Sequence, residues 1–236
     1  AMKTVALLMV LLSGLACGAV VEYPAPGNLD LDEGTMEFWF TPTRELYPPM
    51  GDRKFIGVFS LFSLDVPEQF HAGCGWGVKA EGATLFVSMS APGRDKALLP
   101  VGTHVKGWKA GEAHHVAFTW KGRDMRIYVD GRPGGGRMQA VPFSGGIAQA
   151  RFLVGGVEGR SAGIILHAVR TSSVARTEAM LRNAQPEPDL YSLLVDRFDK
   201  PGKTQAEQIS GLSGEKGATV SKDAQFVQTP KPGLAL

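Results

Sequence analysis

Alternating apolar and polar positions between residues 114 and 130 predict a pair of neighbouring strands. Val116, Phe118 and Trp120 occupy every second position, and Met125, Ile127 and Val129 repeat this spacing after a short polar interval. A period of two residues is typical of a strand with one buried face. The interval, residues 121–124 (KGRD), supplies turn-forming residues, so we expect an antiparallel hairpin.

The hairpin pattern also predicts its own register. If residues 121–124 form the turn, one face pairs Trp120 with Met125, Phe118 with Ile127 and Val116 with Val129. The other face then pairs Thr119 with Arg126, Ala117 with Tyr128 and His115 with Asp130. A shift of one residue would place the apolar side chains opposite polar ones, so the register is well specified.

Similar patterns along the chain predict an all-β protein with antiparallel sheets. Further strands are expected at residues 20–23, 35–41, 54–64, 75–79, 83–90, 150–155 and 164–170, with weaker ones near 97–99 and 104–106. Residues 174–183 predict a short surface helix, and residues 133–136 (PGGG) predict a loop because glycine permits positive φ. The 30 glycines and 15 prolines agree with a chain that has many turns.

Three stretches resemble the laminin-G-like, or concanavalin A-like, domain family. Residues 111–122 (GEAHHVAFTWKG) and 125–132 (MRIYVDGR) resemble the central hairpin of that family. Residues 31–42 (LDEGTMEFWFTP) resemble an early strand, and residues 152–156 and 163–170 resemble late strands. The resemblance implies a two-sheet antiparallel β-sandwich, a jelly roll, over residues 20–188. It implies little about function, because one fold hosts many activities.

The first 19 residues are interpreted as a secretory signal peptide. Lys3 precedes an apolar run at residues 5–12 and a stretch rich in small residues, with cleavage expected after Ala16 or Ala19. Cys17 follows Leu-Ala, which partly resembles a bacterial lipoprotein site and offers lipid attachment as an alternative. We therefore expect a secreted protein or one attached to the cell envelope. Cys74 is then the remaining thiol, and we expect it to be a small apolar core residue.

Residues 189–236 form a C-terminal tail with its own strand pattern. Residues 193–199 (LLVDRFD) and 233–236 (GLAL) resemble segments that come before the first strand in the related family, but here they follow the last one. We expect the tail to complete the sandwich within the same chain, as in a circular permutation. The alternative is that the tail is donated to a neighbouring subunit, which would make residues 190–236 a self-association element.

Composition and motifs argue against several classes of activity. A net charge of +2 gives no electrostatic reason to expect a nucleic-acid partner. The glycosidase relatives carry a Glu-x-Asp-x-x-Glu or Glu-x-Asp-x-Glu run on one strand, and this chain has no such run. Asp30 and Asp32 have suitable spacing but lie at a predicted turn, where solvated carboxylates are common. We therefore expect a protein that is not an enzyme, with an unrecognised acid pair as the alternative.

The sequence also offers little for a metal. His114 and His115 are adjacent, so they point to opposite faces of a strand and do not share a metal easily. Calcium is common in the related family, but His167 and Ala168 stand where relatives often carry acidic residues. Asp196 and Asp199 remain as weak calcium candidates, with ordinary surface carboxylates as the alternative. We expect no cofactor.

Two tryptophans are the candidate ligand-binding residues. Trp76 and Trp108 lie beside glycines in or near predicted loops, where an aromatic ring could form a platform for a sugar. Core packing is the alternative for both, and we expect Trp39 and Trp120 in the core because they lie in regular strands. The resemblance and the missing acid pair together predict a non-catalytic binding or adhesion module for carbohydrate or a surface glycoprotein.

Overall fold

The structure is a computed structural model. It describes residues 21–43, 55–66, 70–79, 82–90, 98–105, 107–122, 124–139, 147–157, 160–161, 164–198, 206–208 and 219–220. For residues 55–60, 65–66, 70–79, 82–83, 88–90, 98–101, 135–139, 156–157, 160–161, 206–208 and 219–220, this description covers the backbone alone. The predicted signal peptide and Cys17 lie outside the described residues.

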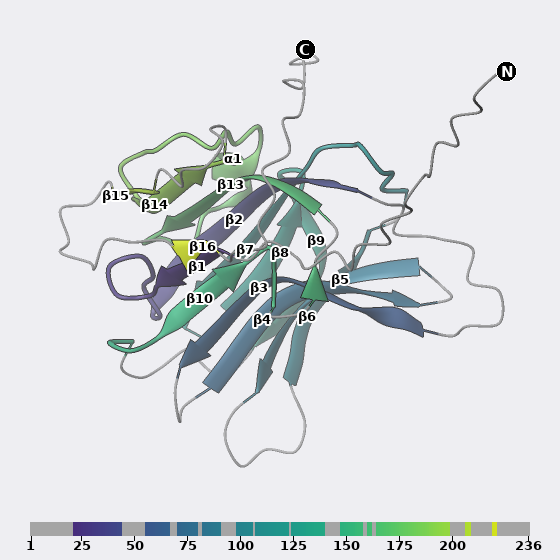
Figure 1. The fold of residues 1–236 in the computed structure, drawn as a ribbon, viewed down its shortest axis with the longest axis horizontal. Coiled ribbons are helices and arrows are strands. Elements are labelled where there is room, and N and C mark those ends of the chain that lie inside the picture. The colour runs from purple at the N-terminus through teal and green to yellow at the C-terminus, as the bar shows by residue number, and fades with distance from the viewer. Residues whose placement is uncertain are drawn as a thin grey trace, which may run out of the picture.

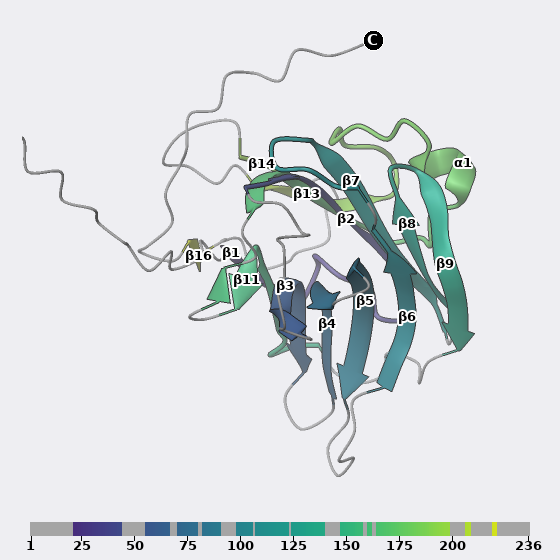
Figure 2. The same ribbon diagram turned by 90° about the vertical axis from the view of Figure 1, so that its right-hand side faces the viewer.

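Two seven-stranded antiparallel sheets pack face to face, which makes the protein an all-β sandwich, as predicted (Figures 1 and 2). Sheet A has the strand order β16-β1-β10-β3-β4-β5-β6, and sheet B has the order β15-β14-β13-β2-β7-β8-β9. The strands of sheet A are β1 (Val21–Pro24), β3 (Phe55–Val66), β4 (Phe70–Lys79), β5 (Gly82–Ser90), β6 (Leu98–His104), β10 (Arg151–Val154) and β16 (Thr219–Val220). Those of sheet B are β2 (Glu33–Pro42), β7 (His114–Lys121), β8 (Asp124–Val129), β9 (Arg132–Gln139), β13 (Ile164–Ser172), β14 (Ser192–Arg197) and β15 (Ala206–Gln208).

The short strands β11 (Gly156–Val157) and β12 (Arg160–Ser161) pair with each other. The single helix of the described residues, α1 (Glu178–Leu181), lies on the outer side of sheet B (Figure 2). It is four residues long, whereas the sequence predicted a helix over residues 174–183. In the described part of the chain, no helix has the length and apolar character needed to cross a bilayer.

The core between the sheets consists of the inward-facing apolar side chains. Sheet B contributes Met36, Phe38 and Phe40 from β2, and Val116, Phe118 and Trp120 from β7, while Phe62, Leu85 and Phe152 come from sheet A. Alternation along each strand places these side chains on one face, where burying them stabilises the fold by removing apolar surface from water.

The predicted hairpin register is confirmed. Trp120 pairs with Met125, Phe118 with Ile127 and Val116 with Val129, while Thr119 pairs with Arg126 and Ala117 with Tyr128. The amide of Asp130 donates to the carbonyl of His115, which continues the same ladder. The apolar set faces the core, and the polar set faces outward.

The prediction of a loop at residues 133–136 was wrong, because these residues belong to strand β9. Pro133 pairs with Tyr128 at the edge of sheet B, where a missing amide donor is tolerated. A Cβ at Gly134 would lie 3.0 Å from both the Ile127 carbonyl oxygen and the Thr103 side chain. The glycine therefore allows β9 to approach β8 and β6 closely, which local turn preferences do not reveal.

Tail strands join both sheets within the chain. Strand β14 pairs with β13, β15 pairs with β14, and β16 pairs with β1. Leu194, Val195 and Asp196 of β14 are buried. Beyond these strands, residues 199–205, 209–218 and 221–236 lie outside the described residues.

Candidate functional site

The outward-facing side of sheet B carries polar side chains in regular rows across strands β2, β7 and β8. The first two rows are Glu33–Lys121–Asp124 and Thr35–Thr119–Arg126. The next two are Glu37–Ala117–Tyr128 and Trp39–His115, with Asp130 following on from His115. Antiparallel pairing sets residues of one row side by side.

Residues 173–191, which we call the strap, cover the last two rows. Leu181 packs on Ala117 and Tyr128 in a small buried cluster. The Trp39 indole Nε1 donates to the Ala184 carbonyl at 3.3 Å. Arg170 Nη1 donates to the carbonyls of Gln185 at 3.1 Å and Glu187 at 2.8 Å. The strap is therefore held to the sheet largely through its own backbone.

Beneath the strap lies a buried group of charged side chains centred on Glu37. Arg170 donates to Glu37 from Nε at 2.6 Å and from Nη2 at 2.8 Å, and Arg176 Nε lies 3.3 Å from the same carboxylate. His115 Nε2 lies 3.2 Å from Glu37 Oε1. Burial alone raises the pKa of Glu37, but the hydrogen bonds from His115 and Arg170 outweigh it and hold the pKa below its ordinary value.

Stacked rings complete this group of residues. The rings of Trp39 and His115 stack with centroids 4.6 Å apart, and the Arg170 guanidinium lies 5.3 Å from the Trp39 ring. Trp39 is consequently half-buried on the outer face, and our expectation of a core position for it was wrong. Trp120 does lie in the core, as predicted.

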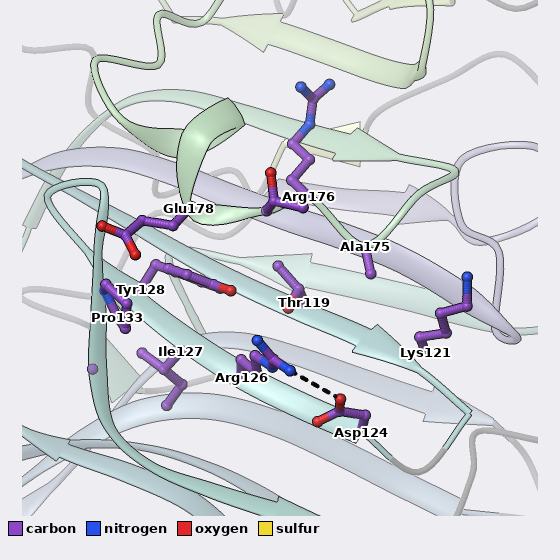
Figure 3. Close-up of a pocket in the computed structure, with 12 residues that line it drawn as sticks. Thr119, Lys121, Asp124, Arg126, Ile127, Tyr128, Pro133, Ala175, Arg176 and Glu178 are labelled. Carbon is purple, nitrogen blue, oxygen red and sulfur yellow. Dashed lines mark hydrogen bonds and ion pairs between the residues drawn. The ribbon is translucent and has the colours of Figure 1, made fainter.

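The β7 and β8 members of the first two rows, Thr119, Lys121, Asp124 and Arg126, form the floor of a groove (Figure 3). The groove has a volume of about 510 Å³. Its floor and walls comprise Thr119, Lys121, Asp124, Arg126, Ile127, Tyr128, Pro133, Gly134, Ala175, Arg176, Thr177 and Glu178. One wall is thus strand β9 and the other is the start of the strap, residues 175–178. This groove is our candidate functional site.

Three hydrogen bonds fix the strap wall to the sheet. Thr35 Oγ1 donates to the Val174 carbonyl at 2.6 Å and accepts from the Arg176 amide at 2.8 Å. The Ala175 amide donates to Glu33 Oε1 at 3.1 Å. Because these bonds join residues about 140 positions apart, the wall is positioned by tertiary structure and not by local sequence.

Arg176 lines the groove with its backbone side and directs its guanidinium away from the floor (Figure 3). Its Nε donates to Ser172 Oγ at 2.9 Å and its Nη2 donates to Asp189 Oδ1 at 2.7 Å. Burial raises the pKa of Asp189, but hydrogen bonds from Arg176 and Ser192 lower it to about 2. Arg176 therefore joins the start of the strap to its end.

Each charged side chain that the structure describes in the groove has a partner of opposite charge. Lys121 Nζ lies 2.9 Å from Glu33, Arg126 Nη2 lies 3.2 Å from Asp124, and Glu178 lies 2.7 Å from Arg182. The hydrogen bond with Lys121 lowers the pKa of Glu33, and the bond with Asp124, followed by one with Tyr128, raises the pKa of Arg126. The groove thus presents fixed donors and acceptors whose charges cancel over short distances.

The predicted site residues do not gather at this groove. Trp108 is only 7% exposed; its ring stacks on His114 with centroids 4.0 Å apart and meets Phe40 edge-on. Trp108 is therefore a core-packing residue, because its ring is buried against Phe40 and His114. Trp76 lies in β4 opposite Leu85 in the backbone register, and its side chain lies outside the described part of the structure, as does that of Cys74.

Asp196 was expected at a solvated surface if it was not a calcium ligand, and that expectation was wrong. It is fully buried between the sheets, where its Oδ2 accepts the Tyr23 hydroxyl at 2.8 Å. Asp199 lies outside the described residues. Within the described residues, no three His, Cys, Asp or Glu side chains come together in a way that could hold a metal ion.

Other sequence expectations are settled by hydrogen bonds. Asp30 accepts the Asp32 amide at 2.9 Å, so this pair forms the predicted turn. His114 and His115 point to opposite faces, as predicted: His114 Nδ1 lies 3.1 Å from Asp130 Oδ2, whereas His115 reaches Glu37. His115 was predicted opposite Asp130, and it bonds to that carboxylate through its backbone amide, at 2.9 Å, and not through its ring.

None of the groove residues was singled out from the sequence. The pairing of Thr119 with Arg126 was predicted, and it placed both on the polar face of the hairpin. A polar outer face is ordinary in an antiparallel sheet and does not by itself indicate a site. The missing information was the position of the strap, which determines which part of this polar face is covered and which part lines the groove.

Comparisons with known proteins are distant. No protein-family model matches the chain, and no curated protein sequence matches it. Among solved structures, it is similar to a heptameric SAP-like pentraxin from Limulus polyphemus, with 15% identity and a TM-score of 0.49, over 87% of this chain and 95% of that one.

Two further similar structures are a sialidase and one domain of an arabinanase. The Trypanosoma rangeli sialidase, in complex with a difluoro sugar acid, shows 18% identity and a TM-score of 0.41, over 64% of this chain and 22% of that one. Domain 4 of an extracellular arabinanase from Geobacillus stearothermophilus, in complex with arabinotriose, shows 16% identity and a TM-score of 0.40, over 66% of this chain and 68% of that one. Likenesses this distant carry no information about ligands, and the fold class rests on the strand pairing described above.

Proposed function

We propose that the protein is an exported, non-catalytic binding module of the laminin-G-like or concanavalin A-like kind, and that it holds a carbohydrate, free or on a surface glycoprotein, in the groove on sheet B. The observation that carries this proposal is the preformed groove, whose lining includes several charged residues. Most small-molecule pockets are predominantly apolar. A groove whose lining includes Lys121, Asp124, Arg126, Glu178 and the exposed Thr177 is matched to a ligand rich in hydroxyl groups.

The state of the carboxylates supports binding without catalysis. Glycoside hydrolysis uses a general acid whose pKa is raised so that it stays protonated near neutral pH. Every described carboxyl group with a clearly shifted pKa is shifted downward: Glu33, Glu37, Asp130 and Asp189. Within the groove, Asp124 and Glu178 are each ion-paired with an arginine.

The proposal is tested by blocking the groove. Thr177 is exposed on the strap wall and precedes α1 without making a side-chain capping bond, so Thr177→Trp fills the groove without removing a described contact. On a glycan array, we expect the wild-type protein to bind a subset of oligosaccharides and Thr177→Trp to lose that binding. Gln149→Trp, at an exposed turn near sheet A, is the matched control and should bind like wild type.

Two results would contradict the proposal. Equal binding by Thr177→Trp and wild type would place the ligand elsewhere on the protein. Release of reducing ends from a bound oligosaccharide would show catalysis instead of simple binding. The proposal of export, with cleavage or lipid attachment near Cys17, is checked separately by intact mass of the mature protein isolated from its source.

A further inference from the structure

The charge arrangement in the groove indicates what kind of carbohydrate it holds. We infer that the ligand is an uncharged glycan, and that the Asp124–Arg126 ion pair recognises two neighbouring hydroxyl groups of one sugar residue. This inference rests on the proposed function, because it names the ligand of the same groove.

The first step concerns the Asp124–Arg126 pair itself. Arg126 Nη2 lies 3.2 Å from Asp124 Oδ2, and both side chains are partly exposed on the groove floor. An acceptor and a donor therefore stand side by side within ordinary hydrogen-bond separation. A sugar hydroxyl both donates and accepts, so one of two neighbouring hydroxyls can donate to Asp124 while the next accepts from Arg126. Hydrogen bonds to charged groups are roughly twice as strong as neutral ones.

The second step concerns acidic ligands, for which the groove is poorly suited. A carboxylate that approached Arg126 would also approach Asp124, which already holds that guanidinium. The other cation of the floor, Lys121, is held by Glu33 at 2.9 Å. The Arg176 guanidinium is turned away and bound to Asp189 and Ser172. Among the described lining residues, no cation lacks an anionic partner, so an anionic group would gain little net attraction.

The third step concerns aromatic stacking. Tyr128 is the only aromatic residue among the described lining residues, and it is 3% exposed because it packs under Leu181 and against Ala117. The described lining therefore offers no exposed aromatic ring on which a sugar could stack. Hydrogen bonds to the paired charges are therefore the main source of affinity, with the hydroxyl of the exposed Thr177 nearby.

The test compares matched neutral and acidic oligosaccharides by calorimetry. Galacto-oligosaccharides of α-1,4 linkage and oligogalacturonates differ in the carboxylate, and neutral hexose and pentose oligosaccharides extend the neutral set. We expect neutral members to bind, with affinity changing less than about twofold between about 0.05 M and about 0.5 M NaCl. We expect Asp124→Asn and Arg126→Gln each to weaken binding about tenfold, as the loss of a charge-assisted hydrogen bond implies.

Matched controls separate binding from folding. Glu22→Gln removes one partner of the exposed Glu22–Arg151 ion pair on sheet A and should bind like wild type. Circular dichroism melts check that both groove variants fold.

The outcomes distinguish this inference from the proposed function. One contrary result is selective binding of oligogalacturonates, with an affinity that weakens with salt and is lost in Thr177→Trp. That result would overturn the inference of an uncharged ligand but would leave the groove as a binding site. Neutral binding that survives both Asp124→Asn and Arg126→Gln would overturn the role of the ion pair. An absence of binding to every neutral and acidic oligosaccharide would overturn both proposals.

Discussion

The guanidinium of Arg170 binds the carboxylate of Glu37 through two hydrogen bonds, from Nε at 2.6 Å and from Nη2 at 2.8 Å, beneath the strap. Both side chains are almost completely removed from solvent. Removing one member of such a pair leaves a buried charge without its main partner. The pair therefore helps to hold residues 173–191 on sheet B.

We expect Arg170→Met to lower the free energy of unfolding by about 3–5 kcal/mol, because Glu37 stays buried and the carbonyls of the strap lose their donor. Urea denaturation at neutral pH measures this. Arg151→Met, which removes an exposed arginine paired with Glu22, is the control and should lose about 1 kcal/mol or less. Equal losses in the two variants would contradict a structural role for the buried pair.

Tyr23 predicts a stability change at high pH. Burial, followed by the charge of Asp196, raises the Tyr23 pKa well above 10.0. The folded state thus holds the phenol proton more tightly than the unfolded state does. The resulting stabilisation is complete below pH 10 and is lost as the pH rises toward the folded-state pKa.

We therefore expect Tyr23→Phe to be less stable than wild type by about 1–3 kcal/mol at neutral pH, since Asp196 loses a hydrogen bond. We also expect it to lose less stability than wild type when the pH is raised from about 8 to about 11. Unfolding curves across that range measure both effects. Tyr191→Phe, at a 40% exposed tyrosine, should retain the wild-type pH dependence. Parallel pH profiles for Tyr23→Phe and wild type would be inconsistent with this account.

Gly34 lies under the Trp120 ring, its partner across strands β2 and β7. A Cβ at position 34 would overlap the indole, which is held by a hydrogen bond from Nε1 to the Asp30 carbonyl at 3.0 Å. We expect Gly34→Ala to lose about 1–3 kcal/mol of stability in denaturant titrations. Gly102→Ala should lose less, because its Cβ would meet its nearest atom at 3.5 Å.

The Trp120→Leu background tests the cause of that loss. If the clash is responsible, Gly34→Ala costs less there than in wild type. Additive effects of the two substitutions would point to another cause.

The lowered pKa of Asp189 predicts a loss of stability at low pH that is smaller than the Tyr23 effect at high pH. Its pKa is lowered to about 2, so its contribution is present above the ordinary value of 3.8 and is lost as the pH falls toward 2. Because the side chain is 39% exposed, solvent screening limits that contribution to about 1 kcal/mol. Asp189→Asn should show this loss at neutral pH and weaker glycan binding, since Arg176 loses its partner at the end of the strap.

Glu112→Gln provides the control, because Glu112 pairs with an exposed lysine away from the groove. It should match wild type in binding. Weaker binding in Glu112→Gln, to the same extent as in Asp189→Asn, would show that the effect is not specific to the strap.

The tail strands predict the oligomeric state. Removing residues 190–236 deletes β14, including the buried Leu194, Val195 and Asp196. We expect the truncated chain not to fold and the full chain to be a monomer by light scattering. A folded, monomeric truncated chain beside an oligomeric full chain would favour the alternative, in which a structural surface protein assembles by exchanging these strands.

Local sequence alternation determined the class of fold and the register of the central hairpin. Between Val116 and Val129, only one register buries all the apolar side chains on one face, so the information is contained in a few neighbouring residues. The same alternation along β2 puts Met36, Phe38 and Phe40 on the core face. Reasoning from local sequence failed for β9, because Gly134 and Pro133 have turn preferences that close packing against β6 and β8 overrides.

Tertiary structure alone decided the candidate site. Glu37 and Arg170 are charged residues that a strand pattern places on the solvent-facing side of a sheet, yet the strap buries them. Whether Arg126 or Tyr128 stays accessible depends on where residues 173–191 lie, and that position is set by hydrogen bonds to residues about 140 positions earlier. Alternation identifies the faces of a sheet, whereas only long-range packing determines which part of a polar face is covered and which part is left as a groove.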